Sequence, residues 1–111
     1  MGTTNEERLA QNEAFFRDIN ERIRGAVEGH PADGHVYEYL CECSDAGCVE
    51  RIRLTTDEYE AVRSDPRRFV LAPGHAVAAI ETVVDAEPEH LVVEKIGAAG
   101  ELAEALDPRA A

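Results

Sequence analysis

The sequence has no tryptophan, a single lysine and no apolar run that approaches the length of a membrane span. A membrane-spanning helix needs about 20 consecutive, predominantly apolar residues. The N-terminal segment is polar and acidic, whereas a signal peptide is basic and then apolar. We therefore expect a cytoplasmic protein that does not associate with membranes.

Basic residues are also scarce. The chain has 11 Lys and Arg against 23 Asp and Glu, which gives a formal net charge of −12 at pH 7. The longest basic run is the pair Arg67-Arg68. A phosphate backbone would meet a repulsive field at such a surface. We therefore expect no nucleic acid partner, and the expected partner is another protein or a second copy of this chain.

A fourth cysteine is missing as well. Cys41, Cys43 and Cys48 lie within eight positions, and the rest of the 111 residues contain no other cysteine. Thiols stay reduced in the cytoplasm, and a disulfide framework uses an even number of cysteines. An iron–sulfur cluster usually takes four thiolates. The cluster therefore indicates thiol ligands for a single metal ion.

The length fits one domain, of a size at which small folds often recruit a metal. We expect an N-terminal helix over 5–24, an α+β core over 36–106 that carries the cysteines, and a tail over 107–111. Metal binding would then contribute directly to the stability of the core.

The N-terminal helix is predicted from its cap and its periodicity. Thr4 and Glu7 have the spacing of a capping box. One stripe of this helix holds apolar residues and one asparagine: Leu9, Asn12, Phe16, Ile19, Ile23 and Ala26. We expect this stripe to dock on the domain's own sheet, and a two-stranded dimer seam is the alternative. Glu13 and Arg17 are expected to form an i,i+4 ion pair on its flank.

A hairpin is predicted around the cysteines. The runs 36–43 and 48–54 alternate as strands do, and 44–47 has the composition of a four-residue turn. If Cys43 lies opposite Cys48, the register follows for three further pairs: Tyr39 with Ile52, Tyr37 with Leu54 and Glu38 with Arg53. This register places all three cysteines on one face near the turn.

The rest of the chain completes an α+β fold. Thr55 to Glu58 form a second capping box, with Leu54 and Tyr59 spaced as a hydrophobic staple. The further elements predicted are a short helix over 56–64, a strand over 68–71, a second hairpin from 80–85 and 90–96, and a terminal helix over 98–106. We expect the two β-hairpins to form a small antiparallel sheet.

Zinc is the metal that this pattern favours, because it takes four thiolate or imidazole ligands in a tetrahedron. The spacing C-x-C-x4-C resembles the zinc-binding tail that follows SET methyltransferase domains, which implies three cysteines sharing a metal with a ligand from elsewhere. We predict His75 as that fourth ligand, since Pro73-Gly74 forms a tight turn that presents it. The alternatives in the chain are His30, His35, His90 and Asp45.

Other uses of the cysteines stay open. A thiol redox sensor would oxidise Cys43 and Cys48 to a cross-strand disulfide, although the neighbouring Glu42, Asp45 and Glu50 should raise the pKa of the thiols. The same acidic residues would line a small zinc hydrolase, if one metal position stayed open to water. Simple burial of the three thiols is the remaining possibility.

Five motifs together resemble a family of short uncharacterised bacterial proteins. They are N-E-x-x-F-R-x-x-N-E-R-I (12–23), C-E-C-x4-C (41–48), L-T-x-x-E-Y-E-x-V-R (54–63), R-F-V-x-x-P-G-H (68–75) and a closing V-V-E-K (92–95). The resemblance implies that these segments belong to one domain, and it implies no mechanism. The sequence as a whole predicts a small zinc-binding module for protein interaction or regulation, with a structural site and no catalytic residues.

Overall fold

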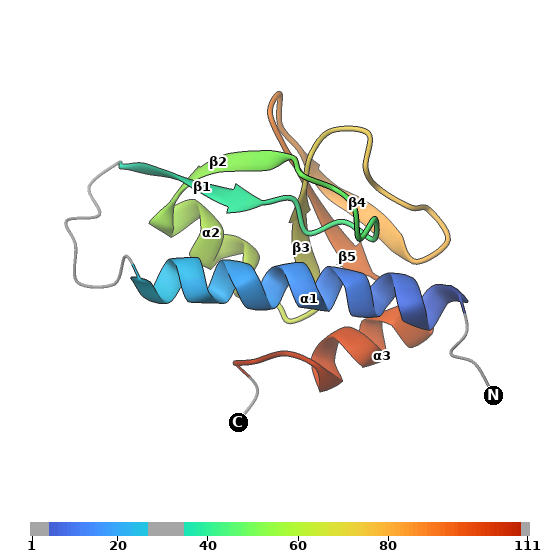
Figure 1. Cartoon of the computed structure of the whole chain (residues 1–111). Coiled ribbons are helices and arrows are strands. Elements are labelled where there is room, and N and C mark those ends of the chain that lie inside the picture. The colour runs from blue at the N-terminus through green and yellow to red at the C-terminus, as the bar shows by residue number, and fades with distance from the viewer. Residues whose placement is uncertain (1–4, 27–34, 110–111) are drawn as a thin grey trace.

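The computed structural model describes residues 5–26 and 35–109 (Figure 1). It contains three helices, α1 (Asn5–Ala26), α2 (Thr56–Val62) and α3 (Gly97–Ala105). Its strands are β1 (Val36–Leu40), β2 (Arg51–Thr55), β3 (Arg68–Leu71), β4 (Glu81–Ala86) and β5 (Leu91–Lys95). The predicted α+β class is confirmed, and the long N-terminal helix, the middle helix and the terminal helix all form.

The strands form two antiparallel sheets. In the first, β1 pairs with β2 and shows the predicted register, with Tyr39 opposite Ile52 and Tyr37 opposite Leu54. In the second, the order is β3-β5-β4. The two hairpins therefore lie in separate sheets, because β3 pairs with β5 and completes a three-stranded unit around the second hairpin.

The start of α2 follows its predicted cap. The Thr55 side chain accepts a hydrogen bond from the Glu58 amide at 3.1 Å, and the Glu58 carboxylate accepts one from the Thr55 amide at 2.8 Å. This capping box fixes the junction at which β2 turns directly into α2. The first predicted box contains Thr4, which lies outside the described residues.

The buried face of α1 differs from the predicted stripe. The most buried positions are Ala10, Glu13, Ala14, Phe16, Arg17 and Asn20, whereas Ile19 and Ile23 are half-buried and Ala26 is exposed. The helix does dock on its own domain, lying across both sheets beside α3 (Figure 1). Its docking face is mixed, so the predicted stripe is right for Phe16, holds in part for Leu9 and Ile23, which pack against the core, and is wrong for Ala26.

The polar groups of this face find partners in other elements. The Lys95 ammonium, at the end of β5, contacts the carboxylates of both Glu13 and Glu81. The Arg17 guanidinium donates to the Pro66 and Ala103 carbonyl oxygens at 2.7 and 2.8 Å. The predicted Glu13–Arg17 pair is therefore wrong. Buried polar groups need such partners, and these come from segments distant in sequence.

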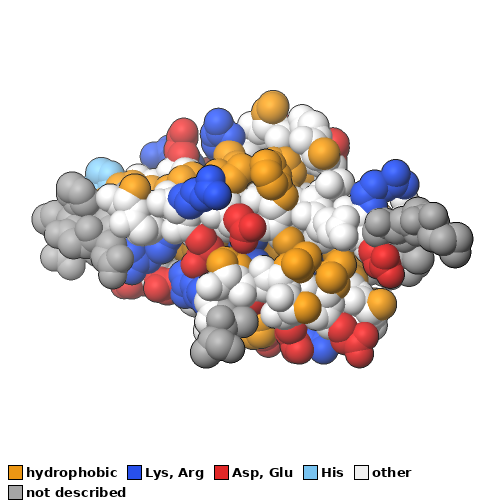
Figure 2. Space-filling model, turned by 60° about the horizontal axis from the view of Figure 1, so that its bottom comes forward, with side chains coloured by type: hydrophobic (Ala, Val, Ile, Leu, Met, Phe, Trp, Pro, Cys, Tyr) orange, Lys and Arg blue, Asp and Glu red, His pale blue; other side chains and the backbone are white. Residues whose placement is uncertain are grey.

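Among the described helices, none combines the length and the apolar character that a bilayer crossing requires. On the face that Figure 2 turns forward, hydrophobic side chains occur in small groups between charged ones.

Candidate metal centre

The first two cysteines follow β1 directly. The strand ends at Leu40, but the Cys41 amide still donates to the Glu50 carbonyl at 3.1 Å, so the hairpin continues one pair beyond the regular ladder. Because side chains alternate along extended backbone, those of Cys41 and Cys43 point to one side and that of Glu42 points to the other. Cys41 and Cys43 are both 1% exposed.

Asp45 organises the turn that presents the third cysteine. Its side-chain Oδ1 accepts from the Gly47 amide at 2.9 Å, and its carbonyl accepts from the Cys48 amide at 3.0 Å. These are the bonds of an Asx turn followed by a tight backbone turn. The Asp45 carboxylate is therefore occupied in shaping the turn, and Cys48 returns toward the other two cysteines.

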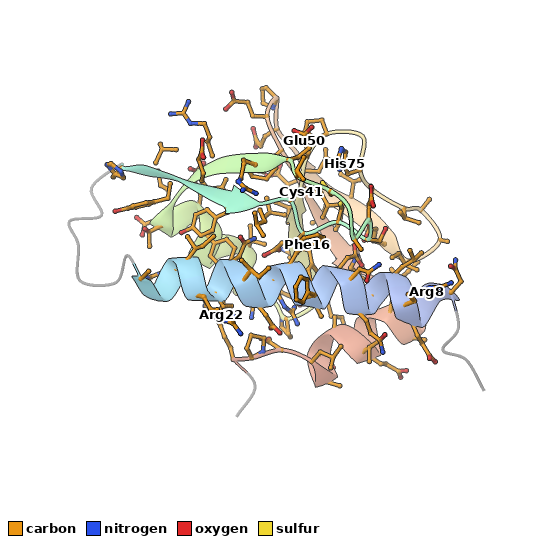
Figure 3. All side chains as sticks on the ribbon, viewed as in Figure 1. Arg8, Phe16, Arg22, Cys41, Glu50 and His75 are labelled. Carbon is orange, nitrogen blue, oxygen red and sulfur yellow. The ribbon has the colours of Figure 1, made fainter. Side chains whose placement is uncertain are left out.

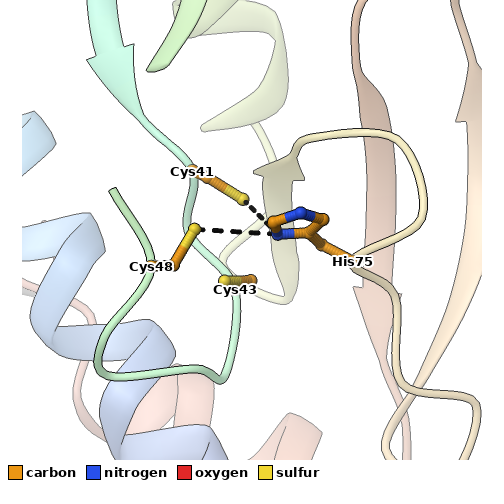
Figure 4. Close-up of side chains that lie close together, drawn as sticks. All are labelled: Cys41, Cys43, Cys48 and His75. Carbon is orange, nitrogen blue, oxygen red and sulfur yellow. Dashed lines mark hydrogen bonds between the residues drawn. The ribbon is translucent and has the colours of Figure 1, made fainter. Parts of the chain in front are cut away.

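His75 comes from a turn at the end of β3. The His75 amide donates to the Ala72 carbonyl at 3.1 Å, and Gly74 has φ of 83°. Pro73 and Gly74 are thus the central residues of a type II turn, in which proline fixes the first φ and glycine supplies the positive one. The turn aims the imidazole at the cysteine loop (Figures 3 and 4).

The structure brings the four predicted side chains together. The sulfurs of Cys41, Cys43 and Cys48 and a ring nitrogen of His75 all lie within 4.8 Å of one another. The Sγ atoms of Cys41 and Cys48 each lie 3.6 Å from Nδ1 of His75. In tetrahedral zinc, bonds of about 2.3 Å to sulfur and about 2.0 Å to nitrogen imply sulfur–nitrogen separations of about 3.5 Å. The observed distances fit that geometry.

The alternative ligands lie elsewhere. His35 packs against the Tyr37 ring at 4.5 Å between centroids. His90 lies beside the turn between β4 and β5, in a different hollow of the surface. His30 lies outside the described residues. The described part of the chain therefore offers the cysteine loop one imidazole, that of His75.

The three thiols differ in acidity. The hydrogen bond from Cys41 is the largest influence on Cys43, and it lowers the pKa of Cys43 to about 5 despite burial, with further help from His75. Donating that bond, together with burial, raises the pKa of Cys41. Burial raises the pKa of Cys48. The expectation that acidic neighbours raise the pKa of every thiol is wrong for Cys43, because the other donors of the cluster outweigh them.

A backbone amide supports the site from outside the four side chains. The Ala72 amide donates to Cys41 Sγ at 3.1 Å. Such bonds to metal-binding sulfurs orient the ligand and stabilise its charge. The amide belongs to the same turn that presents His75, so one short segment supplies both a donor nitrogen and a supporting contact.

The sequence predicts Glu42 as an acidic neighbour of the metal and does not predict its buried structural role, because an acidic side chain beside cysteines suggests solvent exposure. It is fully buried on the side opposite the sulfurs. Its carboxylate accepts from Asn20 in α1, Tyr59 in α2 and the Val70 amide in β3, at 2.8 to 3.1 Å. The alternation Cys-Glu-Cys is the one sequence signal for this, since it assigns Glu42 to the opposite face from the cysteines.

A second contact joins α1 to the cysteine loop. The Asn12 side chain donates to the Ser44 carbonyl at 2.8 Å, close to the turn that carries Cys48. The resemblance motif that begins with Asn12 therefore includes residues that hold the helix against the candidate site. The loop is fixed from three directions: by α1, by β3 and by its own hairpin.

Comparisons with known proteins found no family model, no curated protein and no solved structure that matches this chain.

Proposed function

We propose that this protein is a zinc-binding module for protein interaction or regulation, whose metal is held by Cys41, Cys43, Cys48 and His75. One observation carries the proposal: four side chains from two separate loops converge with their donor atoms within 4.8 Å. Three thiolates and an imidazole are ligands that zinc favours, and such thiolate-rich sets are typical of structural sites.

The bound metal would join the two sheets. Cys41, Cys43 and Cys48 belong to the loop of the β1–β2 hairpin, and His75 belongs to the loop after β3. A chain of 111 residues gains folding stability from such a link, because the ligands converge only in the folded state. The role that follows is structural, in a cytoplasmic protein that presents its surface to a partner.

A hydrolytic role is less favoured by the geometry. A catalytic zinc keeps one coordination position for water, whereas the four donors that converge here are enough to complete a tetrahedron without water. Two of the three acidic residues considered for such a site have other tasks. Glu42 is turned into the core and Asp45 holds the turn.

The redox sensor is the second candidate, and the partial exposure of Cys48 favours it. Cys48 is half-buried while the other two thiols are almost inaccessible, so an oxidant reaches the cluster through this sulfur. The described cysteines are all free thiols. Titration with a thiol reagent separates the two functions: a metal-held cluster reacts only after a chelator is added, and a sensor reacts at once.

The primary test is elemental analysis of protein purified without added metal. The proposal predicts about one zinc per chain in the unaltered protein, and strong loss of zinc in Cys41→Ser and in His75→Ala. His90→Ala is the matched control, since this imidazole lies outside the cluster, and it should keep the full zinc content. Zinc-free protein that remains folded would contradict the proposal.

The proposed partner is another protein or a second copy of this chain, and α1 is the proposed contact surface. Phe15 is 61% exposed on this helix, although its ring packs edge-on against Phe16 at 5.8 Å. Sedimentation analysis of Phe15→Ala tests self-association through this helix: loss of a dimer supports it, and a monomeric unaltered protein excludes it.

A further inference from the structure

A long groove runs between β2 and the turn that joins β4 to β5. Its main part has a volume of about 980 Å³ and is lined by residues of α2, of the β4–β5 hairpin, and by single residues of β1, β2 and β3. A second hollow of about 310 Å³ continues it past Arg51 to Pro73. The two hollows share Arg53, Pro88 and Glu89 in their linings, so they adjoin each other beside β2.

The other sheet edges are partly covered, closed or irregular within the described chain. Beside β1, α1 packs against the strand and the Asn20 side chain takes both backbone groups of Leu40, while the outward groups of Val36 and Glu38 have no described partner. Beside β3, the Glu42 amide donates to the Val70 carbonyl at 2.8 Å, and the Glu42 carboxylate accepts from the Val70 amide. The edge strand β4 contains a register shift in its middle. Such features are the usual means by which proteins prevent strands from adding to a sheet.

The outer edge of β2 has no such protection. The bond from the Cys41 amide to the Glu50 carbonyl fixes the alternation of the ladder, so the backbone groups of Arg51 and Arg53 point away from β1. The next amide on that side, of Thr55, is taken by the cap of α2. No partner to the backbone of Arg51 or Arg53 exists within 5–26 and 35–109. This edge faces the tip of the β4–β5 hairpin (Figure 1).

The groove is apolar at its base and charged on its walls. Val62 and Val92 are largely buried within it, and Val84 is 42% exposed. Arg53 lies on the β2 side, and its side chain makes no ion pair with the described residues. The opposite wall carries the carboxylates of Asp85, Glu87 and Glu89 together with His90. Glu58 and Arg68 line the groove too, but Glu58 caps α2 and Arg68 pairs with Glu94, so Arg53 is the lining cation without an ion pair among the described residues.

A second copy paired antiparallel about Ile52 is disfavoured at this edge. Antiparallel pairing of two β2 strands about Ile52 would set Arg51 of each opposite Arg53 of the other. Like charges directly opposite each other destabilise a strand pair. A different segment with an acidic side chain beside Arg53 avoids this repulsion and complements the charge of Arg53.

We infer that β2 accepts an extended peptide of a partner protein as an additional strand in this groove. Main-chain hydrogen bonds to Arg51 and Arg53 hold the peptide, and its alternate apolar side chains lie on the valines. An acidic side chain meets Arg53, and a basic side chain meets the carboxylates of the opposite wall. This site is separate from the four candidate zinc ligands, and it goes beyond the proposed zinc function.

The test uses the full chain, with its zinc content measured in each sample, and a synthetic probe. The probe is acetyl-Thr-Val-Glu-Val-Lys-Val-Thr-amide, compared with one version in which Lys replaces Glu and one in which Glu replaces Lys. We expect saturable binding of the mixed-charge probe with a Kd below about 1 mM, and at least about tenfold weaker binding of the other two. Amide NMR signals of β2 and of 87–90 should shift.

In an added strand, only every second residue directs its backbone N–H and C=O groups toward β2. Changes to the peptide amides therefore provide a control that leaves the protein unchanged. N-methylation of one alternate set of peptide amides should abolish binding, and N-methylation of the other set should preserve it. Equal binding of both methylated peptides would overturn the inference, as would strongest binding of the all-basic or all-acidic probe, shifts confined to other surfaces, or no saturation.

The protein side is tested with Arg53→Glu, which should weaken binding of the mixed-charge probe by at least about tenfold. Arg22→Glu is the matched control, because this exposed arginine of α1 changes the net charge equally and lies outside the groove. Equal effects of the two variants would overturn the inference. A sample that lacks zinc but binds the probe contradicts the zinc proposal alone, and a zinc-loaded sample without probe binding contradicts this inference alone.

Discussion

The side chain of Asn20 occupies the place of a neighbouring strand beside Leu40. Its Oδ1 accepts from the Leu40 amide at 2.7 Å, and its Nδ2 donates to the Leu40 carbonyl at 2.9 Å. The same Nδ2 donates to Glu42. One amide of α1 thus satisfies the last residue of β1 and part of a buried carboxylate, immediately before the first candidate zinc ligand.

Replacing Asn20 by Ala should therefore destabilise the fold strongly. The substitution leaves a backbone amide, a backbone carbonyl and part of a carboxylate without partners, and each buried unsatisfied group costs about 1–3 kcal/mol. We expect a loss of about 2–4 kcal/mol in urea unfolding. Gln11→Ala, at an exposed position of the same helix, should change the stability by less than about 0.5 kcal/mol. Equal effects of the two variants would contradict this role of Asn20.

Gly74→Ala should impair the turn that presents His75. Gly74 has φ of 83°, which an alanine adopts at a cost of about 1–2 kcal/mol. Open space surrounds the position, so the cost comes from the backbone and not from a clash. We expect about tenfold weaker zinc binding in competition with a chelating dye, because about 1.4 kcal/mol corresponds to a factor of ten.

The control for this variant is Gly25→Ala. Gly25 lies in α1, has open space around it and carries no positive φ. Alanine favours a helix by about 1 kcal/mol over glycine. This variant should keep the zinc affinity and raise the thermal midpoint slightly. Unchanged zinc affinity in Gly74→Ala would contradict the role of the turn.

The buried cluster around Lys95 predicts a dependence of stability on pH. Two carboxylates share one ammonium, and burial raises the pKa of Glu13 from 4.5 to about 7, although Lys95 opposes the change. Above pH 4.5 the unfolded chain releases this proton while the folded protein keeps it. The contribution to stability is therefore full below pH 4.5 and is lost as the pH rises through 7.

Glu13→Gln removes this titration. Between pH 5 and 7 the free energy of unfolding of this variant should therefore fall less than that of the unaltered protein, and the two slopes should differ by up to about 1.4 kcal/mol per pH unit. Urea unfolding across this range, with excess zinc present, measures the difference. Glu101→Gln, on the exposed side of α3, is the control and should retain the unaltered slope. Parallel profiles for Glu13→Gln and the unaltered protein would contradict the assignment.

The hairpin could be predicted from the sequence because its signals are local. Alternation fixes the faces of β1 and β2, and a shift of one residue would have broken the pairings of Tyr37 and Tyr39. The position of His75 could be predicted for the same reason, since Pro73-Gly74 specifies a turn by its own chemistry. In both cases the residues that determine the geometry are neighbours in sequence.

The docking face of α1 could not be predicted because its partners are distant. Glu13 and Arg17 have the spacing of a surface ion pair, and the sequence alone does not reveal that Lys95 and the Ala103 carbonyl compete for them. The division into two sheets was missed for a related reason: the pairing of β3 with β5 joins segments separated by a hairpin. Long-range pairing overrides local pattern at these positions.

The most direct test of the zinc site is X-ray absorption at the zinc edge of the purified full chain. The account predicts about one zinc per chain, with three sulfur neighbours at about 2.3 Å and one nitrogen at about 2.0 Å. His75→Ala should lose most of its zinc, and any zinc that remains should show the sulfur neighbours without the nitrogen contribution. A folded protein without zinc, or a zinc ion surrounded by oxygen and nitrogen alone, would contradict the account.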